Sequence, residues 1–209
     1  MTRVTWYYDV ISPYAYLQSA RLDVLPAAVE LECLPVLFAG LLDHWGQKGP
    51  AEIPAKRVFT FRQTKWRAEK AGVPYRLPPM HPFNPLRALR LAIALGGDLA
   101  MIRRLFACVW QDGLLPDDDD GWRGIQQALD VTDGDALVAQ PAVKQQLLDN
   151  GQRAIAEGVF GVPSFVVDGE VFWGDDSLDF LLDYLADPAM FDDPEIARIE
   201  TIQPSAVRR

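Results

Sequence analysis

The hydrophobic pattern predicts a strand, a helix and a second strand within the first forty residues. Residues 3–8 are rich in β-branched and aromatic side chains, which favour a strand, and the turn residues of Asp9–Pro13 end it. From Tyr14 onward apolar residues recur at spacings of three and four, so we expect a helix that ends near Pro26–Glu30. Residues 29–38 form the second predicted strand. This order predicts two parallel neighbouring strands joined by a right-handed crossover.

The middle of the chain, residues 40–158, shows helical periodicity and loops but no pattern typical of a strand. Proline or glycine punctuates the boundaries of four predicted helices, at 54–72, 85–96, 99–112 and 142–157. The acidic run 117–120 fails as an EF-hand loop because Gly121 stands where the fifth-position ligand is required. We therefore expect that run to be a solvated loop.

Strand patterns return near the end of the chain. Two short apolar runs, 163–167 and 170–173, flank Asp168-Gly169, which is a strong signal for a β-hairpin. Residues 174–177 supply side chains suited to a helix N-cap, and regularly spaced leucines follow them, so we expect a closing helix. The segment from Asp187 onward is rich in proline and acidic residues, and its weak pattern predicts a tail that runs over the surface.

Length and charge narrow the class of protein. The chain has 209 residues, which indicates one enlarged domain or a small domain with an insertion. Its net charge of −9 has the wrong sign for holding phosphate backbones, so we expect no nucleic-acid partner. The longest nearly uncharged apolar run, Cys33–Leu42, is about half the length of a membrane span, so we expect no membrane partner either. Residues 1–9 show no signal-peptide pattern, which predicts a cytoplasmic protein.

The cysteine content argues against disulfides and structural metals. Two cysteines, Cys33 and Cys108, are too few for a disulfide framework and do not form a Cys-x-x-Cys pair. Neither has a second cysteine or a histidine at metal-ligand spacing. We predict no metal site.

Two local motifs resemble those of a known family. The segment Tyr8–Leu17 is similar to the opening of the 2-hydroxychromene-2-carboxylate isomerases and the kappa-class glutathione transferases, in which Ser-Pro-Tyr replaces a redox Cys-Pro. The segment Gly158–Phe165, followed by Phe172–Asp176, is similar to the second signature of that family. Further similarities, at Pro54–Arg57, Trp66 and Pro82–Asn84, extend the resemblance to about residue 186.

The resemblance implies an α/β fold of the DsbA and kappa-class type, in which a thioredoxin-like βαβ…ββα domain carries a large all-helical insertion. The order of the predicted elements is the layout of that fold. We expect a thioredoxin-like domain formed by residues 1–38 and 159–187, a helical insertion at 39–158 and a C-terminal tail at 188–209.

Ser12 is the candidate catalytic residue. It precedes Pro13, which suits the first position of a helix, and side chains at a helix N-terminus face unpaired backbone donors and the positive end of the helix dipole. A serine cannot exchange disulfides, and the sequence offers it no obvious base among His44 and His81. We interpret Ser12 as a hydrogen-bond donor to the thiolate of another molecule. The alternative is that Ser12 merely caps the helix.

Val162-Pro163 carries a second expectation. In the family that the chain resembles, the matching proline is cis, and the residue before it pairs with the cysteinyl part of glutathione like an added strand. The alternative is an ordinary trans proline at the start of an edge strand. We predict a cis bond within contact distance of Ser12.

The resemblance implies glutathione as the cofactor and assigns further ligand positions. Lys56 stands at a position that contacts glutathione, and Gln47 stands where kappa-class relatives have an asparagine. Asp175 and Asp176 of the second motif are both expected at the glutathione site, and Asp176 aligns with an aspartate that holds the γ-glutamyl amine. The alternative is that Asp176 or Ser177 caps the last helix. Ser177 departs from the arginine common after that aspartate, so a salt bridge from that position is not expected.

The substrate pocket is harder to assign from sequence. The residues proposed to line it are Tyr14, Trp66, Asn84 and Trp173. Large aromatic side chains, including Trp110, suit a flat pocket for a bicyclic aromatic acid, but at helical spacing they equally suit a core. Asn84 either reaches the substrate or closes a turn.

Taken together, the resemblance implies a glutathione-dependent isomerase. The reaction expected is interconversion of 2-hydroxychromene-2-carboxylate and trans-o-hydroxybenzylidenepyruvate-type substrates by reversible thiolate addition. Two alternatives stay open: a kappa-like glutathione transferase, and a redox-inactive DsbA-like binding module. The partners expected are a small aromatic substrate and a second copy of the chain in a homodimer.

Overall fold

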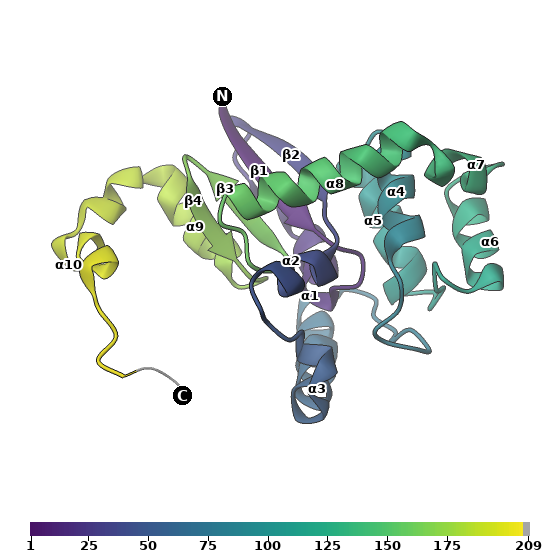
Figure 1. Cartoon of the computed structure of the whole chain (residues 1–209), viewed down its shortest axis with the longest axis horizontal. Helices are drawn as coiled ribbons and strands as arrows, with labels where there is room; N and C mark the ends of the chain where they lie inside the picture. The colour runs from purple at the N-terminus through teal and green to yellow at the C-terminus, as the bar shows by residue number, and fades with distance from the viewer. Residues whose placement is uncertain (207–209) are drawn as a thin grey trace.

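The computed structural model describes residues 1–206 (Figure 1). Its strands are β1 (Thr2–Tyr8), β2 (Val29–Pro35), β3 (Ser164–Val167) and β4 (Glu170–Trp173). Its α-helices are α1 (Pro13–Ser19), α2 (Phe38–His44), α3 (Pro54–Ala71), α4 (Leu86–Ala94), α5 (Leu99–Trp110), α6 (Asp119–Ala128), α7 (Gly134–Ala139), α8 (Pro141–Ala156), α9 (Ser177–Ala186) and α10 (Pro194–Ala197). Short 3₁₀ turns lie at Leu22–Val24, Pro50–Glu52, Pro188–Asp192 and Ile199–Thr201.

The sheet has the strand order β2-β1-β3-β4, so β1 lies in its interior. Strand β1 runs parallel to β2, with Tyr8 opposite Pro35, and antiparallel to β3, with Tyr7 opposite Ser164. Strands β3 and β4 form the predicted antiparallel hairpin. The parallel pair and the hairpin that the sequence predicts are both confirmed. The pairing brings the end of β1 beside the beginning of β3.

Both faces of β1 are buried, which fixes the position of its carboxyl end. Successive strand side chains point to opposite faces. Val4, Trp6 and Tyr8 therefore pack into a large core with residues of α1, α4 and α5, whereas Tyr7 packs into a smaller core with residues of α2 and α8. All four side chains are fully buried. Figure 1 shows α8 crossing one face of the sheet.

The four helices predicted in the middle of the chain are confirmed as α3, α4, α5 and α8, to within two residues at each end. The first helix and the second strand are shorter than predicted. Helix α1 ends at Ser19 and is followed by the 3₁₀ turn at Leu22–Val24; Pro26 cannot continue a helix, and Leu25 before it is extended, at φ −61° and ψ 137°. Strand β2 ends at Pro35 because Phe38 already begins α2.

The acidic run is not a solvated loop throughout, because Asp119 and Asp120 form the first turn of α6. The Asp118 carboxylate caps this helix by accepting a hydrogen bond from the Gly121 N–H at 2.8 Å. Acidic side chains are favourable at a helix N-terminus, so their clustering here is a helix-start signal that the sequence analysis interpreted as a loop. Helices α2 and α7 were also not predicted.

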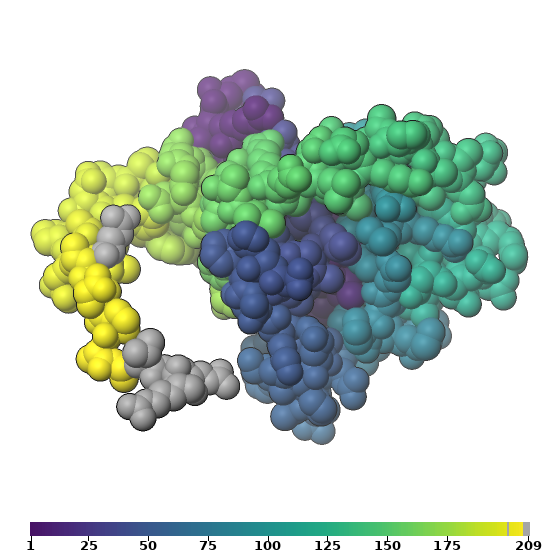
Figure 2. Space-filling model, viewed as in Figure 1, coloured from purple at the N-terminus to yellow at the C-terminus, as the bar shows by residue number. Residues whose placement is uncertain are grey.

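The C-terminal tail is attached to the sheet by an aromatic cluster. The Phe191 ring lies 4.9 Å from the Tyr184 ring, 5.6 Å from that of Phe180 and 6.1 Å from that of Phe172 on β4. Beyond this cluster, the tail extends away from the body of the molecule (Figure 2). Within residues 1–206, none of the helices combines the length and the apolar character that a membrane span requires.

Two helical glycines provide a matched stability test. A Cβ at Gly121 would overlap the backbone of Leu115, lying 2.6 Å from its nitrogen, whereas a Cβ at Gly151 in α8 would meet nothing within 4 Å. We expect Gly121→Ala to lower the free energy of unfolding by roughly 1 to 3 kcal/mol through overpacking. We expect Gly151→Ala to raise it by about 0.5 to 1 kcal/mol, the difference in helix propensity. Urea unfolding of both variants measures these changes, and equal effects would contradict the packing described around α6.

Candidate active site

The candidate site lies where β1 ends and α1 begins. Ser12 is the N-cap of α1, and its Oγ accepts a hydrogen bond from the Ala15 N–H at 3.2 Å. The same Oγ lies 3.5 Å from the carbonyl oxygen of Val162, although 150 residues separate the two in sequence. The Val162–Pro163 peptide bond is cis. Both parts of the prediction for this bond are confirmed.

Several hydrogen-bond donors at this position are available for a ligand. The contact from the Ser12 hydroxyl to Val162 is longer than an ordinary O–H···O hydrogen bond, so the hydroxyl is free to donate elsewhere. Among residues 1–206, neither the Val162 N–H nor the Tyr14 N–H donates a hydrogen bond. The Ser12 hydroxyl and the Tyr14 N–H both belong to the N-terminus of α1, where donors favour a nearby anion.

The turn that carries Ser12 is held by contacts from distant parts of the chain. The Trp110 indole donates to the Val10 carbonyl at 2.9 Å, and the His81 Nε2 lies 2.9 Å from the Ile11 carbonyl. The Ser12 N–H donates to the Asp9 carbonyl at 3.0 Å. Each carbonyl of the turn from Asp9 to Ile11 therefore has a donor. This pairing fixes the backbone that presents Ser12.

His81 is a residue whose place the sequence analysis missed. Since a carbonyl only accepts, its Nε2 carries the hydrogen, and burial lowers the pKa of the ring so that it stays neutral. Its Nδ1 is buried and has no hydrogen-bond partner among the described residues. Because Nε2 is committed to Ile11, His81 positions the turn and does not serve as a base for Ser12. Its place directly before Pro82–Asn84, a segment of the family resemblance, was the available signal.

Asp9 is the second residue missed. Its side chain is fully buried, and its carboxylate accepts one hydrogen bond from the Ile11 N–H at 3.0 Å and one from the Phe38 N–H at 2.9 Å. Burial raises the pKa of this carboxyl to about 7, although the two N–H donors favour its charged form. The sequence analysis treated Asp9 only as the end of a strand, whereas the structure places it under the turn of Ser12.

The proposed glutathione ligands fall into two groups. Gln47, Lys56 and Asp176 are exposed, and the Asp176 side chain makes no capping hydrogen bond to α9. Asp175 is buried, and its carboxylate pairs with Arg67 of α3 at 2.8 Å and lies 4.0 Å from Arg21. Asp175 therefore ties the start of α9 to α3, which leaves Asp176 as the better ligand of the two.

The four residues proposed for the substrate pocket lie in separate surroundings. The Tyr14 hydroxyl donates to Gln63 of α3 at 2.7 Å, and burial raises its pKa, so it is a neutral donor. Trp173 is 56% exposed, with its ring 5.1 Å from that of Phe160. The Asn84 side chain accepts from the Leu86 N–H at 3.0 Å, which supports the turn-closing alternative.

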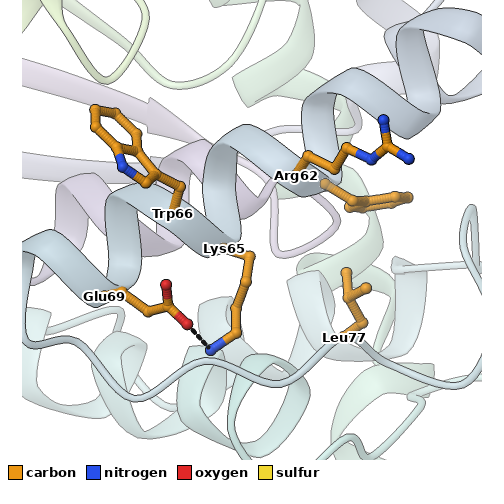
Figure 3. Close-up of a pocket in the computed structure, with 6 residues that line it drawn as sticks. Arg62, Lys65, Trp66, Glu69 and Leu77 are labelled. Carbon is orange, nitrogen blue, oxygen red and sulfur yellow. Dashed lines mark ion pairs between the residues drawn. The ribbon is translucent and has the colours of Figure 1, made fainter.

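Trp66 lies on the outer side of α3, beside a shallow hollow of about 360 Å³. The hollow is lined by Phe61, Arg62, Lys65, Trp66, Glu69 and Leu77 (Figure 3). Figure 3 shows Lys65 paired with Glu69, at 2.8 Å, between Trp66 and Leu77. Trp110, by contrast, is fully buried, so its role is in the core.

Comparisons with known proteins agree with this fold. The family model described as the DSBA-like thioredoxin domain matches residues 3–186. A 2-hydroxychromene-2-carboxylate isomerase of Sphingobium xenophagum is 30% identical over 88% of this chain and 98% of its own. Glutathione s-transferase kappa 2 of Caenorhabditis elegans is 27% identical over 88% of this chain and 92% of its own. A solved structure of a 2-hydroxychromene-2-carboxylate isomerase superposes with a TM-score of 0.75 at 21% identity, covering 93% of this chain and 98% of that one.

The buried carboxyl of Asp9 predicts an unusual pH dependence of stability. A group whose pKa is raised on folding, here from 3.8 to about 7, stabilises the folded state at low pH and loses that contribution as pH rises through the folded value. We expect this contribution to fall by about 2 kcal/mol between pH 5 and pH 7. Urea unfolding at several pH values, compared between wild type and Asp9→Asn, isolates it. A difference in unfolding free energy that does not change with pH would contradict the burial of an ionisable Asp9.

Proposed function

Because the chain belongs to the DSBA-like thioredoxin family and is related over most of its length to 2-hydroxychromene-2-carboxylate isomerases, we propose that it is a glutathione-dependent isomerase. The proposed substrates are 2-hydroxychromene-2-carboxylate and trans-o-hydroxybenzylidenepyruvate-type acids. The observation that carries this proposal is the meeting of Ser12 with the Val162–Pro163 backbone, with free donors on both sides.

The donors at the site fit the chemistry of a bound thiol. When bound, glutathione supplies a thiolate, which adds reversibly to a conjugated double bond and is also a good leaving group. The Ser12 hydroxyl and the unpaired Tyr14 N–H are donors that a bound thiolate can accept from, and hydrogen bonds to the charged form of an acid lower its pKa. A serine hydroxyl in this position stabilises the anion without competing with it as a nucleophile, because its own ionised form is too basic to leave.

The remaining ligand contacts are assigned to backbone and surface side chains. The free N–H and the carbonyl of Val162 suit pairing with the peptide backbone of glutathione, as in an added strand. Asp176, exposed beside the start of α9, suits the amine of the γ-glutamyl group, and Lys56 suits a carboxylate. Gln47, which follows α2, suits a peptide or carboxylate group.

Charge on α3 supports binding of anions to a protein whose net charge is −9. The helix carries six basic residues and one acidic residue. Within the described chain, four of the six form no ion pair, namely Lys56, Arg57, Arg62 and Lys70. Glutathione and an aromatic carboxylate are both anions, so a locally basic helix attracts them against the overall charge.

Two measurements test the proposal. Calorimetric titration and thermal unfolding with and without glutathione measure binding. If glutathione produces neither heat of binding nor a shift in melting temperature, both the isomerase and the transferase proposals are excluded. Incubation with glutathione and a panel of hydroxychromene carboxylates, followed by absorbance, measures isomerisation. An electrophilic aryl halide in the same panel detects conjugation, and conjugation without isomerisation would replace the proposal with a kappa-like transferase.

Loss of the Ser12 hydroxyl should weaken ionisation of the bound thiol. A charge-assisted hydrogen bond contributes roughly 1.5 to 3 kcal/mol, so we expect Ser12→Ala to raise the pKa of bound glutathione by about one to two units. Turnover at neutral pH should fall by roughly ten- to a hundredfold and recover partly at higher pH. Thiolate absorbance near 240 nm, titrated against pH, measures the change.

The matched control is Ser19→Ala, which removes a buried hydroxyl from the other end of α1. Its titration curve should equal that of the wild type. Identical curves for Ser12→Ala and wild type would show that Ser12 only caps the helix.

We also expect no catalytic oxidation or reduction of dithiols. The site contains no sulfur, and burial raises the pKa of Cys33 to about 12 and that of Cys108 to about 11, which suppresses both thiolates. An insulin-reduction assay measures this activity. Turnover that disappears on changing either cysteine would place the reactive centre away from Ser12.

A further inference from the structure

Helix α2 begins without a cap of its own, and Asp9 takes that role from another element. The N-cap residue, Leu37, has no polar side chain, so the first N–H of the helix, that of Phe38, would be unpaired. The Asp9 carboxylate, at the end of β1, accepts this N–H at 2.9 Å. Its other oxygen accepts the Ile11 N–H of the Ser12 turn at 3.0 Å. One buried carboxylate therefore joins the turn to α2.

The far end of α2 reaches the other half of the site. Trp45, the C-cap of α2, donates its indole N–H to the Val159 carbonyl at 3.0 Å. Three residues further along the chain, the Val162 carbonyl lies 3.5 Å from Ser12 Oγ. The contacts thus form a closed ring that runs from Ser12 through Asp9, α2 and Val159 back to Ser12. Gln47, a proposed ligand, follows α2 directly and pairs its own N–H with the Leu42 carbonyl.

Asp9 is the member of this ring whose charge changes near neutral pH. Two titratable groups lie next to this turn: Tyr8, whose buried hydroxyl has a raised pKa and interacts with the charge of Asp9, and His81, which contacts the Ile11 carbonyl and whose lowered pKa keeps it neutral. On α2 itself, Asp43 and His44 are exposed at the far end of the helix. Among the residues described, no cation forms an ion pair with Asp9, so two backbone N–H groups alone stabilise its charge.

Protonation changes how many of these hydrogen bonds Asp9 accepts. The carboxylate accepts both N–H groups, one on each oxygen. In the protonated form one oxygen carries a hydrogen and faces an N–H donor, so one of the two bonds weakens. Because burial raises the pKa of Asp9 to about 7, both forms are populated at neutral pH.

We propose that Asp9 is a positioning residue whose ionised carboxylate holds α2 against the Ser12 turn, and whose protonation loosens the glutathione site. The inference rests on the proposed function for the identity of the ligand. It predicts that part of the pH dependence of ligand binding belongs to Asp9 and is separate from ionisation of the thiol.

The first test needs no ligand. In ¹⁵N-labelled protein, the amide protons of Ile11 and Phe38 should change chemical shift together between pH 5.5 and 8.5, with a common midpoint near pH 7. The change should vanish in Asp9→Asn, which presents one acceptor and one donor at every pH. Asp43→Asn, the same change at an exposed acid on α2, should leave it intact. Shifts that do not titrate in the wild type, or that titrate unchanged in Asp9→Asn, would overturn the proposal.

The second test measures binding of S-methylglutathione, which has no thiol to ionise. If only the ionised form binds, wild-type affinity should fall by up to about tenfold from pH 8 to pH 6, and that of Asp9→Asn should stay nearly constant. Binding that is equally strong at both pH values in the wild type would overturn the role of Asp9. Absence of binding at every pH, with titrating amides, would overturn the proposed function and leave the Asp9 link standing.

Discussion

Burial of β1 on both faces is the constraint on which the rest of the structure depends. Strand β1 is paired on both edges and covered on both faces, so its register in the sheet is fixed. The position of the residues that follow Tyr8 is therefore fixed as well. Parallel pairing with β2 and antiparallel pairing with β3 then bring the start of α1 and the segment before β3 to the same end of the sheet. The candidate site depends on this pairing, because Ser12 comes from the start of α1 and Val162 comes from the segment before β3.

Local signals made much of the fold predictable. Alternating apolar residues and the Asp168-Gly169 turn act over a few residues, and the strands and hairpin that they predict are present. The start of α6 was harder to predict, because acidic side chains are common both in solvated loops and in the first turn of a helix. The placing of Ser12 against Val162 came from resemblance to a family, and the structure confirms it at 3.5 Å. The glutathione ligands and the homodimer stay predictions.

The contacts that hold the site could not be predicted from the sequence, because they join residues with no local relation. Asp9 meets Phe38 across 29 residues, His81 meets Ile11 across 70, and Trp45 meets Val159 across 114. In each contact the partner is a backbone N–H or carbonyl. Nearly every residue carries these groups, so the sequence does not show which of them a side chain will contact. For Asp9 the visible sign was an acid next to an apolar strand, and its complete burial in the structure is what reveals its role.

The state of the two cysteines has a practical consequence for spectroscopy. Cys108 is buried and Cys33 is partly covered, and both thiols have pKa values far above neutrality. Maleimides and iodoacetamides react with thiolates, so the native chain should take up these reagents slowly. One cysteine introduced at an exposed position would then be the preferred attachment point for a fluorophore or a spin label. Two such cysteines, one on α3 and one on the tail, would make the distance between these segments measurable in solution without first removing the native cysteines.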